Sequence, residues 1–342
     1  MKYISFAIPS YNSEKYLHHA VDTILSGGED VEIIIVNDGS SDGTAVIADA
    51  YAAEHPSIVK VIHKENGGHG SGVNAGLANA SGLFFKVVDS DDWVNEKALK
   101  ALIDTLKNHV SKGLEADLYI TNFIYDHALD GKQFVRNWNK HFPVNRFCGW
   151  NDAKTFIGPQ VILMHSLLYK TDILRNSGTV LPEHTFYVDN IYAYRPLPYT
   201  KKLFYLDVNL YHYFIGRADQ SVNIQNMTKR YDQQIRVMRN MLEAYTYEEI
   251  CSFDKQLKKY MLHDLSALMM TTMMFCCSGG NEPERKEAYQ AMWDDLEERD
   301  PDLFQYLTKK GLPALSVWMP WKMRGKAMLW GYNVLCKVIK LG

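Results

Sequence analysis

Cysteines are few in this chain, and neither sign of charge is in large excess. The 342 residues include five cysteines, an odd number, and no two of them have the spacing of a structural zinc site. A disulfide framework is therefore excluded, and reduced thiols in a cytoplasmic protein are the expectation. The formal net charge of −3 gives no general attraction to nucleic acid, so we expect no nucleic-acid partner.

Long apolar runs are also lacking. Residues 1–9 contain neither the apolar stretch nor the cleavage site of a signal peptide, and the longest mostly apolar run, 265–277, is too short to span a bilayer. A hydrophobic content of 46% and an aromatic content of 12% nevertheless exclude a disordered chain. The length allows roughly two domains of about 150 residues each.

The first 125 residues alternate between short β-branched runs and segments of helical period. Near-continuous apolarity, as in residues 31–36, predicts strands that are buried on both faces. Strand–helix alternation at this spacing predicts an α/β fold with a mostly parallel, doubly wound sheet, in which ligands bind at the carboxyl ends of the strands. We expect strands at 3–8, 31–36, 59–62, 83–88 and 118–123, and helices at 13–25 (capped by Asn12 or Ser13), 43–54, 71–80 and 96–112.

Polar clusters follow four of these strands. They are Pro9-Ser10-Tyr11-Asn12, residues 37–44, the glycine-rich stretch 66–74 and Asp89-Ser90-Asp91-Asp92. Each cluster alone fits an ordinary turn or connector. All four fall on the same edge of the predicted sheet, and together they predict a binding site there.

The last cluster places three carboxylates within four residues. Their mutual repulsion is costly unless a cation neutralises it, and oxygen ligands favour Mg²⁺ or Mn²⁺, which also hold a diphosphate. We therefore expect Asp89 and Asp91 to bind the metal, although Asp92 as an N-cap of a helix starting near Asn95 is the simpler alternative. Asp38, after another strand, is placed to accept hydrogen bonds from a nucleobase or ribose.

These motifs, in this order and spacing, resemble those of family 2 glycosyltransferases over residues 3 to about 125. Further along, Tyr187-Val188-Asp189-Asn190 resembles the later acidic motif of the family, and 211–221 resembles its closing segment. One departure is Gly72-Val73-Asn74, where the family often has Ala-Arg-Asn. The role of the missing arginine then falls to His69 or Arg217.

The resemblance implies a GT-A fold and inverting transfer from a nucleotide sugar, usually UDP-linked, through Mn²⁺ or Mg²⁺. It implies a hydroxyl acceptor in a bacterial cell-surface polysaccharide, glycolipid or lipid-linked precursor. Asp189 is the expected general base, with Glu183 in reserve, because the acceptor hydroxyl must lose its proton. At the matching positions, donor contacts are implied for Pro9, Tyr11, Asn12, Asp38, Asn66, Gly67, His69, Asn74, Asp89, Ser90, Arg217 and Ser221.

Two other functions stay open. A nucleotidyltransferase on a similar sheet would have a basic residue in a glycine-rich loop after the first strand, and Pro9-Ser10-Tyr11-Asn12 has none. A non-catalytic nucleotide-sugar-binding scaffold would not need the carboxylates that are present. Trp138 and Trp150 fit sugar stacking and core packing equally well, and His165 fits either the acceptor side or the core.

The C-terminal part differs from the rest. We expect a catalytic domain at 1–225 (nucleotide-sugar binding at 1–125, acceptor side at 126–225), a helical region at 226–305 and a basic amphipathic segment at 306–342. Residues 308–342 hold seven Lys or Arg and no acidic residue. A lysine stripe, a broad apolar face and several tryptophans predict that 315–341 lies on the inner leaflet of an anionic membrane. Docking on the same chain or within a homo-oligomer is the alternative.

Overall fold

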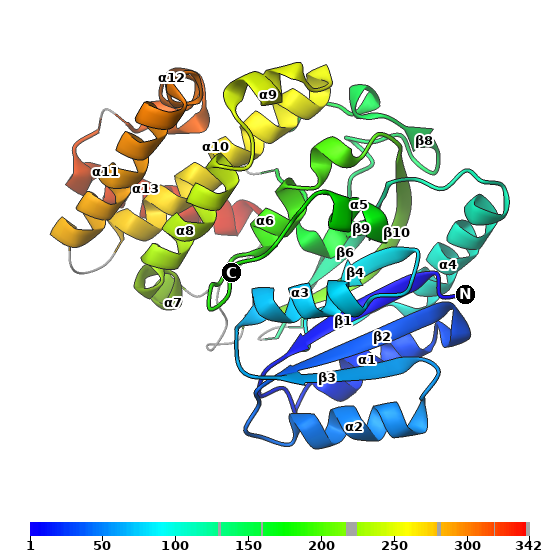
Figure 1. The fold of residues 1–342 in the computed structure, drawn as a ribbon. Coiled ribbons are helices and arrows are strands. Elements are labelled where there is room, and N and C mark those ends of the chain that lie inside the picture. The colour runs from blue at the N-terminus through cyan, green and yellow to red at the C-terminus, as the bar shows by residue number, and fades with distance from the viewer. Residues whose placement is uncertain (129–130, 159, 217–223, 279–281, 318, 340–342) are drawn as a thin grey trace. The chain divides into compact units, whose positions relative to one another are not determined.

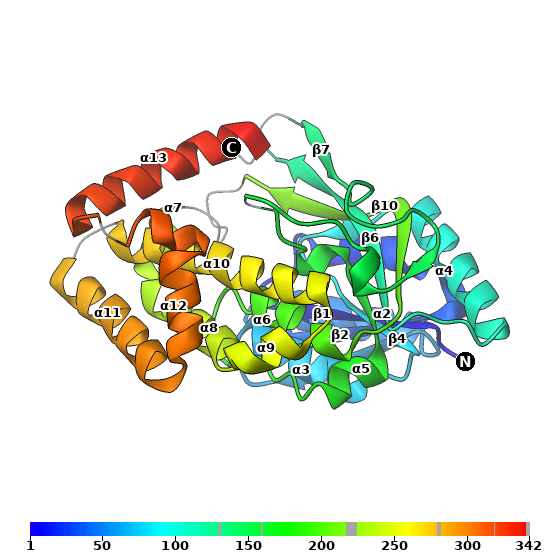
Figure 2. The ribbon, with the colours of Figure 1, turned by 90° about the horizontal axis from the view of Figure 1, so that it is seen from above.

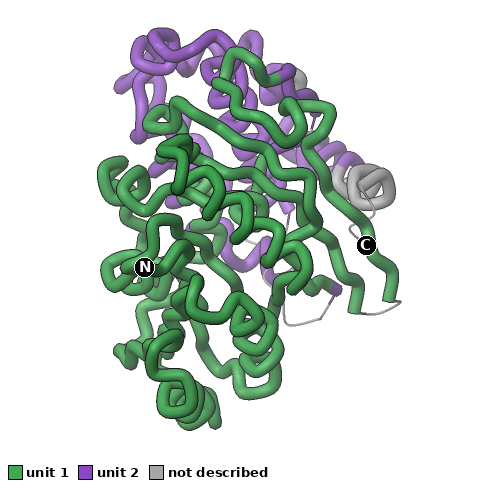
Figure 3. The backbone as a smooth tube through the Cα atoms, turned by 90° about the vertical axis from the view of Figure 1, so that its right-hand side faces the viewer, with its two compact units in different colours: residues 1–153, 162–215 green, residues 154–161, 216–342 purple. Residues whose placement is uncertain are grey.

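The structure is a computed structural model that describes residues 1–128, 131–158, 160–216, 224–278, 282–317 and 319–339. The chain divides into two compact units, which Figure 3 colours separately. Unit 1 comprises residues 1–153 and 162–215, and unit 2 comprises residues 154–161 and 216–342. Among the described residues, no helix combines the length and apolarity needed to cross a membrane.

Unit 1 is built on a mixed sheet whose N-terminal half is parallel. Strands β1 (Ile4–Ser10), β2 (Val31–Asp38), β3 (Val59–Lys64) and β4 (Phe84–Val87) lie in the order β3-β2-β1-β4. Every residue of β1, β2 and β4 is buried, as the continuous apolar runs predict. The predicted strands are therefore confirmed, and their carboxyl ends point to one edge of the sheet.

Beyond β4 the sheet continues through the predicted strand at 118–123 and through strands that the sequence pattern does not reveal. Strand β9 (Leu167–Lys170) pairs antiparallel with both β4 and β6 (Leu118–His127), and β10 (Leu203–Ile215) runs parallel to β6. Short strands complete the described part of the sheet: β5 (Trp93–Val94) and β8 (Phe147–Cys148) pair with β10, and β7 (Gln133–Arg136) pairs with β6.

Helices cover both faces of the parallel strands. The connections β1–α1–β2 and β2–α2–β3 run in one direction along the sheet, and β3–α3–β4 runs in the other. Because such crossovers are right-handed, α3 lies on the face of the sheet opposite to that of α1 and α2 (Figure 1). Helix α3 packs against β1 and β2. The helices of unit 1 are α1 (Leu17–Leu25), α2 (Thr44–Glu54), α3 (His69–Asn79), α4 (Glu96–Ser111), α5 (Thr171–Asn176) and α6 (Asp189–Tyr194), with 3₁₀ turns at Gly28–Asp30, Trp150–Asp152, Met164–Ser166 and Leu197–Tyr199.

The first helix begins at Leu17, four residues later than expected, and neither Asn12 nor Ser13 caps it. Asn12 has a left-handed backbone, with φ of +50°, and its side chain accepts a hydrogen bond from the Ser41 N–H at 2.9 Å. The Ser13 N–H donates to Thr44 Oγ1 at 2.7 Å. Because these tertiary contacts occupy residues 12 and 13, the helix forms only after them.

The described residues 131–150 contain regular structure, although their sequence shows no clear period. Part of the stretch forms the β6–β7 hairpin, and both tryptophans are buried. The indole N–H of Trp138 donates to Ser166 Oγ at 2.8 Å, and that of Trp150 donates to Thr200 Oγ1 at 3.0 Å. Both tryptophans therefore belong to the core.

Unit 2 is helical, as expected for the C-terminal part. Helix α10 packs against α8, α11 and α13 (Figure 2). Its residues Met261, Met269 and Met273 are fully buried and belong to the core, whereas Met270 is partly exposed. The helices are α7 (Ile224–Lys229), α8 (Tyr231–Leu242), α9 (Tyr247–Ser252), α10 (Lys255–Cys277), α11 (Glu282–Arg299), α12 (Pro301–Lys309) and α13 (Trp321–Ile339), with a 3₁₀ turn at Leu312–Leu315.

Candidate functional site

Side chains and backbone groups at the carboxyl edge of the parallel strands bond to one another. The loops after β1 and β2 are joined by the bond between Asn12 and Ser41. The loops after β1 and β4 are joined by Ser13 Oγ and Ser90 Oγ, 2.7 Å apart. The polar clusters that the sequence places at separate strand ends are thus parts of one structure.

Asp38, the last residue of β2, anchors the glycine-rich loop. Its carboxylate is buried and accepts hydrogen bonds from the N–H groups of Gly67 at 2.9 Å and Gly68 at 2.7 Å. The Lys64 ammonium pairs with the same carboxylate at 2.7 Å. Asn66 Nδ2 donates to the Asp38 carbonyl at 2.9 Å. The donor contact expected of Asp38 remains a prediction, and the carboxylate also holds this loop in place.

The glycines of the loop permit close packing. A Cβ on Gly70 would lie 2.6 Å from the Pro182 carbonyl oxygen, and one on Gly72 would lie 2.8 Å from Pro9 Cβ. Gly68 has a φ of +82°, which favours glycine. The glycine-rich pattern therefore reflects the approach of neighbouring chain segments to the start of α3.

His69, the first residue of α3, pairs with Asp89. Its Nε2 atom lies 2.8 Å from Asp89 Oδ1. Burial acts to lower the pKa of His69, but the charge of Asp89, the bond to it and the charges of Asp189 and Asp91 together outweigh burial and raise that pKa. Burial likewise acts to raise the pKa of Asp89, but the charge of His69, the bond to it and the charges of His165 and Lys86 together lower that pKa. The pair therefore favours an imidazolium and a carboxylate.

Asp92 does not cap the following helix. It is buried, and its carboxylate accepts hydrogen bonds from the Tyr211 hydroxyl at 2.5 Å and the Phe214 N–H at 2.8 Å. The cap is Asn95, whose Oδ1 accepts from the Ala98 N–H at 3.0 Å. The capping alternative for Asp92 is therefore wrong. Burial raises the Asp92 pKa well above its usual value.

Asp89 and Asp91, both partly exposed, flank Ser90 in the loop after β4. The described residues contain no group of three or more His, Cys, Asp and Glu side chains arranged to hold a metal ion by themselves. Mg²⁺ in nucleotide sites takes only one or two carboxylates and completes its shell with phosphate oxygens and water. Two carboxylates on one short loop fit that donor set.

Asp189 begins helix α6 and belongs to the same charge cluster. Burial raises its pKa to about 6. The charge of His69 lowers this pKa and that of Asp89 raises it, so both groups are within electrostatic reach. Glu183, the reserve base, is exposed and accepts a hydrogen bond from Ser71 Oγ at 3.0 Å.

The other candidates differ in placement. Tyr11 is 56% exposed beside the strand ends, whereas Pro9 packs under α3. The Asn74 carboxamide bonds to the backbone of Leu181. Arg217 and Ser221 lie outside the described residues, so their expected donor contacts remain predictions.

Sequence reasoning missed a buried cation beneath the acidic loop. Lys86 in β4 is fully buried and donates to the carbonyls of His165 at 2.7 Å and Leu167 at 3.2 Å. Its ammonium lies 5.2 Å from the Tyr211 ring centroid, and the His165 ring stacks on Tyr211 at 4.8 Å. Burial lowers the pKa of Lys86 to about 7 and that of His165 to about 4. A lone lysine in an otherwise apolar strand was the available signal.

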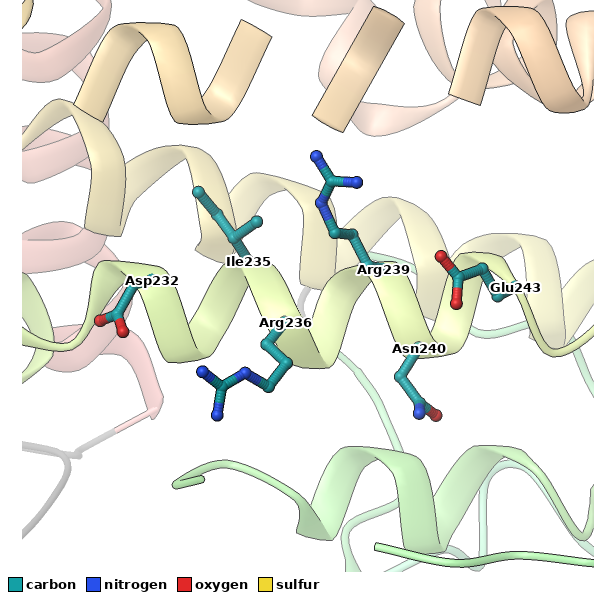
Figure 4. Close-up of a pocket in the computed structure, with 6 residues that line it drawn as sticks. All are labelled: Asp232, Ile235, Arg236, Arg239, Asn240 and Glu243. Atoms are coloured by element: carbon teal, nitrogen blue, oxygen red, sulfur yellow. The ribbon is translucent and has the colours of Figure 1, made fainter. Parts of the chain in front are cut away.

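A shallow cavity of about 410 Å³ lies along α8 in unit 2 (Figure 4). Two of its charged residues are already paired, because Arg239 bonds to Asp295 and Glu243 bonds to Arg299. None of the predicted site residues lines it, so it has no part in the site above. Its lining residues are Asp232, Ile235, Arg236, Arg239, Asn240 and Glu243.

Comparison with known proteins gives one consistent family. The model of "Glycosyl transferase family 2" matches residues 5–169. Glycosyltransferase GlyG of Streptococcus pneumoniae is 33% identical in an alignment of length 217 that covers 56% of this chain and 70% of GlyG. The putative glycosyltransferase EpsH of Bacillus subtilis is 27% identical, over 68% of this chain and 64% of EpsH. The minor teichoic acid biosynthesis protein GgaB of B. subtilis is 30% identical, over 50% of this chain and 18% of GgaB.

Solved structures share the fold at low sequence identity. S. aureus TarS in complex with UDP-GlcNAc matches with a TM-score of 0.66 and 17% identity, over 97% of this chain and 92% of that one. The Pyrobaculum calidifontis mannosyltransferase PcManGT, in complex with GDP-Man and Mn²⁺, matches with a TM-score of 0.52 and 14% identity, over 99% and 86%. The fold is therefore the expected GT-A fold. With the family match and the identity to GlyG, the chain belongs to glycosyl transferase family 2.

Proposed function

We propose that this glycosyltransferase is inverting and metal-dependent, and that it moves a sugar from a UDP-linked donor to a hydroxyl of a cell-surface glycan or lipid-linked precursor. The observation that carries the proposal is the convergence of Asp89, Asp91 and Asp189 around His69 at one edge of the sheet. Such an edge is where ligands bind in this class of sheet.

The donor is inferred from the site and from solved structures that share the fold. Asp38 and the loop after β1 are assigned to the nucleotide, and Asp89 and Asp91 to the diphosphate through a divalent ion. The TarS complex with UDP-GlcNAc supports a UDP-linked donor, and the PcManGT complex with GDP-Man and Mn²⁺ supports the metal and keeps a GDP-linked donor as the alternative.

Asp189 is assigned the role of general base. An acceptor hydroxyl is a poor nucleophile near neutral pH, so a carboxylate must take its proton as the oxygen attacks the anomeric carbon. The new glycosidic bond forms while the bond from that carbon to the diphosphate breaks, and the nucleoside diphosphate leaves with the electron pair. One displacement inverts the anomeric centre, so one base suffices. Bound Mn²⁺ or Mg²⁺ would neutralise charge on the diphosphate.

Helix α13 supports a peripheral membrane location for this reaction. At about 100° per residue, Lys322, Met323, Lys326 and Trp330 fall within a sector about 100° wide. All four are exposed, Met323 to 59% and Trp330 to 71%. Two lysines beside exposed methionine and tryptophan match a helix face that lies on an anionic bilayer.

The opposite side of α13 packs within unit 2. Gly325 is buried, and a Cβ there would lie 2.7 Å from the Cys277 carbonyl oxygen. The Trp321 ring lies 5.6 Å from the Tyr289 ring. Docking on the same chain, the alternative to membrane binding, therefore holds for this side of α13, and the exposed side remains available to a membrane. Contact of α13 with the inner leaflet would bring the enzyme close to a lipid-linked acceptor.

The deciding experiment pairs binding with turnover. Thermal shifts with UDP-, GDP- and dTDP-sugars and Mn²⁺ should single out one donor, since stabilisation follows RT ln(1 + [L]/Kd). Release of the nucleoside diphosphate from that donor should then depend on Mn²⁺ and stop with EDTA. Binding without release would favour a non-catalytic scaffold, and release of pyrophosphate from a nucleoside triphosphate would favour a nucleotidyltransferase.

A further inference from the structure

Residues 181–188, which we call the strap, lead directly into Asp189 and lie against helix α3. Asn74 of α3 bonds to the first strap residue twice: its Nδ2 donates to the Leu181 carbonyl at 2.9 Å, and its Oδ1 accepts from the Leu181 N–H at 3.0 Å. The donor and acceptor ends of the carboxamide are both committed to the strap. A role in binding the sugar nucleotide, which the sequence resemblance implies for Asn74, would compete with these bonds.

Further contacts fix the middle of the strap on the same loop and helix. The His184 N–H donates to the Gly67 carbonyl at 2.6 Å. The Ser71 hydroxyl donates to Glu183 at 3.0 Å. At Gly70, a Cβ would lie 2.6 Å from the Pro182 carbonyl oxygen, so the strap backbone approaches the helix at a place where only glycine fits.

The strap backbone adopts conformations that depend on its contacts with neighbouring residues. His184 and Tyr187 have φ of +47° and +65°, in the left-handed region that residues other than glycine rarely adopt. Such conformations persist when the surroundings determine them. At the far end, Asn190 Nδ2 donates to the Tyr187 carbonyl at 2.9 Å and so ties the strap to the start of α6. Asp189 lies between these fixed points.

We propose that Asn74 is a positioning residue for Asp189, holding the strap on α3 and thereby placing the carboxylate at the donor site. The inference rests on the proposed role of Asp189 as general base. Its physical reason is that α3 also carries His69, which pairs with Asp89. Helix α3 therefore holds the acidic loop after β4 through its first residue, His69, and holds the strap through Asn74.

The test is the Asn74→Leu variant, which keeps the side-chain size and removes both bonds. We expect kcat for UDP release from the donor sugar nucleotide to fall by about ten- to a hundredfold, as expected when a base is displaced. The donor KM and the calorimetric Kd for UDP should stay within about twofold. Asn79→Leu is the matched control on the same helix, because Asn79 is exposed and its side chain, among the described residues, bonds only to the Ala75 carbonyl of its own helix.

A second variant reaches the strap without changing Asn74. Gly70→Ala introduces the Cβ that meets the Pro182 carbonyl, so it should give the same loss of kcat with unchanged UDP affinity. If Asn74→Leu folds poorly, this variant alone decides the question.

Three outcomes would overturn the inference. A rise in donor KM at constant kcat would make Asn74 a donor contact, wild-type kinetics would leave it without a role, and parallel losses of Tm and UDP affinity would make its role structural only. Failure of the proposed function is distinguishable. In that case Asp189→Asn keeps the wild-type rate of UDP release, or the wild type releases none.

Discussion

His69 Nε2 lies 2.8 Å from Asp89 Oδ1, and this pair joins the start of α3 to the acidic loop after β4. Each partner favours the charged form of the other. The pair therefore supplies a positive charge beside a cluster of carboxylates, where a donor diphosphate and a divalent ion are proposed to bind.

Asp91→Asn should abolish most metal-dependent turnover and leave the fold intact. The substitution keeps the side-chain volume and removes one of the two carboxylates assigned to Mn²⁺ or Mg²⁺. UDP release should fall at least a hundredfold at limiting Mn²⁺, while Tm stays within a few degrees. Full activity of EDTA-treated wild type would show that no metal is needed.

Asp189→Asn should lower kcat by a factor on the order of 10² to 10⁴, which is typical of losing a positioned general base. UDP affinity should barely change. Because burial raises the Asp189 pKa to about 6, the wild-type kcat should fall as the pH drops through about 6, where the base becomes protonated. The variant should lack this dependence.

The same raised pKa predicts the effect on stability. Ionised Asp189 is disfavoured in the folded state, so Asp189→Asn should be at least as stable as the wild type near pH 8. Near-normal turnover in this variant would move the role of base to Glu183 or elsewhere.

Asp38→Ala should weaken binding of free UDP as well as of the sugar nucleotide. The carboxylate is assigned to the nucleotide and also holds the Gly67 and Gly68 N–H groups. Loss of bonds to a charged group predicts a roughly ten- to hundredfold higher Kd by calorimetry. Lys64→Met is the control, because it removes the ion pair at 2.7 Å and the bond to the Glu65 carbonyl but keeps the Asp38 carboxylate. Unchanged UDP affinity in Asp38→Ala would contradict the assignment.

Lys86→Met should change how stability depends on pH. Burial lowers the Lys86 pKa to about 7, so between pH 7 and 10 the unfolded chain holds this proton more often than the folded protein does. The free energy of unfolding of the wild type should therefore rise relative to that of the variant, by roughly 2 kcal/mol from pH 7 to pH 9. Urea unfolding of both proteins at the two pH values measures the difference, and a constant difference would show that Lys86 does not titrate in this range.

Membrane binding should depend on the exposed face of α13. Replacing Lys322 and Lys326 by glutamate should weaken co-sedimentation with anionic phosphatidylglycerol vesicles at least tenfold, since each lysine near such a surface contributes about 1 kcal/mol. Replacing Lys255 and Lys259 is the control, because these lysines are also exposed and have the same spacing on α10. A truncation at about Lys310 should lose binding altogether. Equal binding of all forms, or none even at low salt, would contradict the proposal.

Much of the site could be predicted from the sequence because its functional residues directly follow recognisable strands. Asp89 and Asp91 follow an apolar strand directly, and Asp38 ends another, so strand periodicity alone placed them at one edge. Other elements could not be predicted from the sequence. Strand β10 has no simple alternation, because it is half buried and pairs with β6, β5 and β8 along its length. The late start of α1 depends on contacts with residues 40–44 that sequence patterning does not contain.

The sequence by itself determined the parallel half of the sheet, the acidic loop and the family motifs, because hydrophobic period and strand-end chemistry act over a few residues. Only the tertiary structure decided what Asp92, Asn74 and the glycines of residues 67–72 contact. Their partners Tyr211, Leu181 and Pro182 are distant in the chain, and the contacts exist only once the sheet and α3 have packed. Burial has the same origin. It depends on the whole fold, and it is what raises the pKa of Asp189 to about 6 and lowers that of Lys86 to about 7.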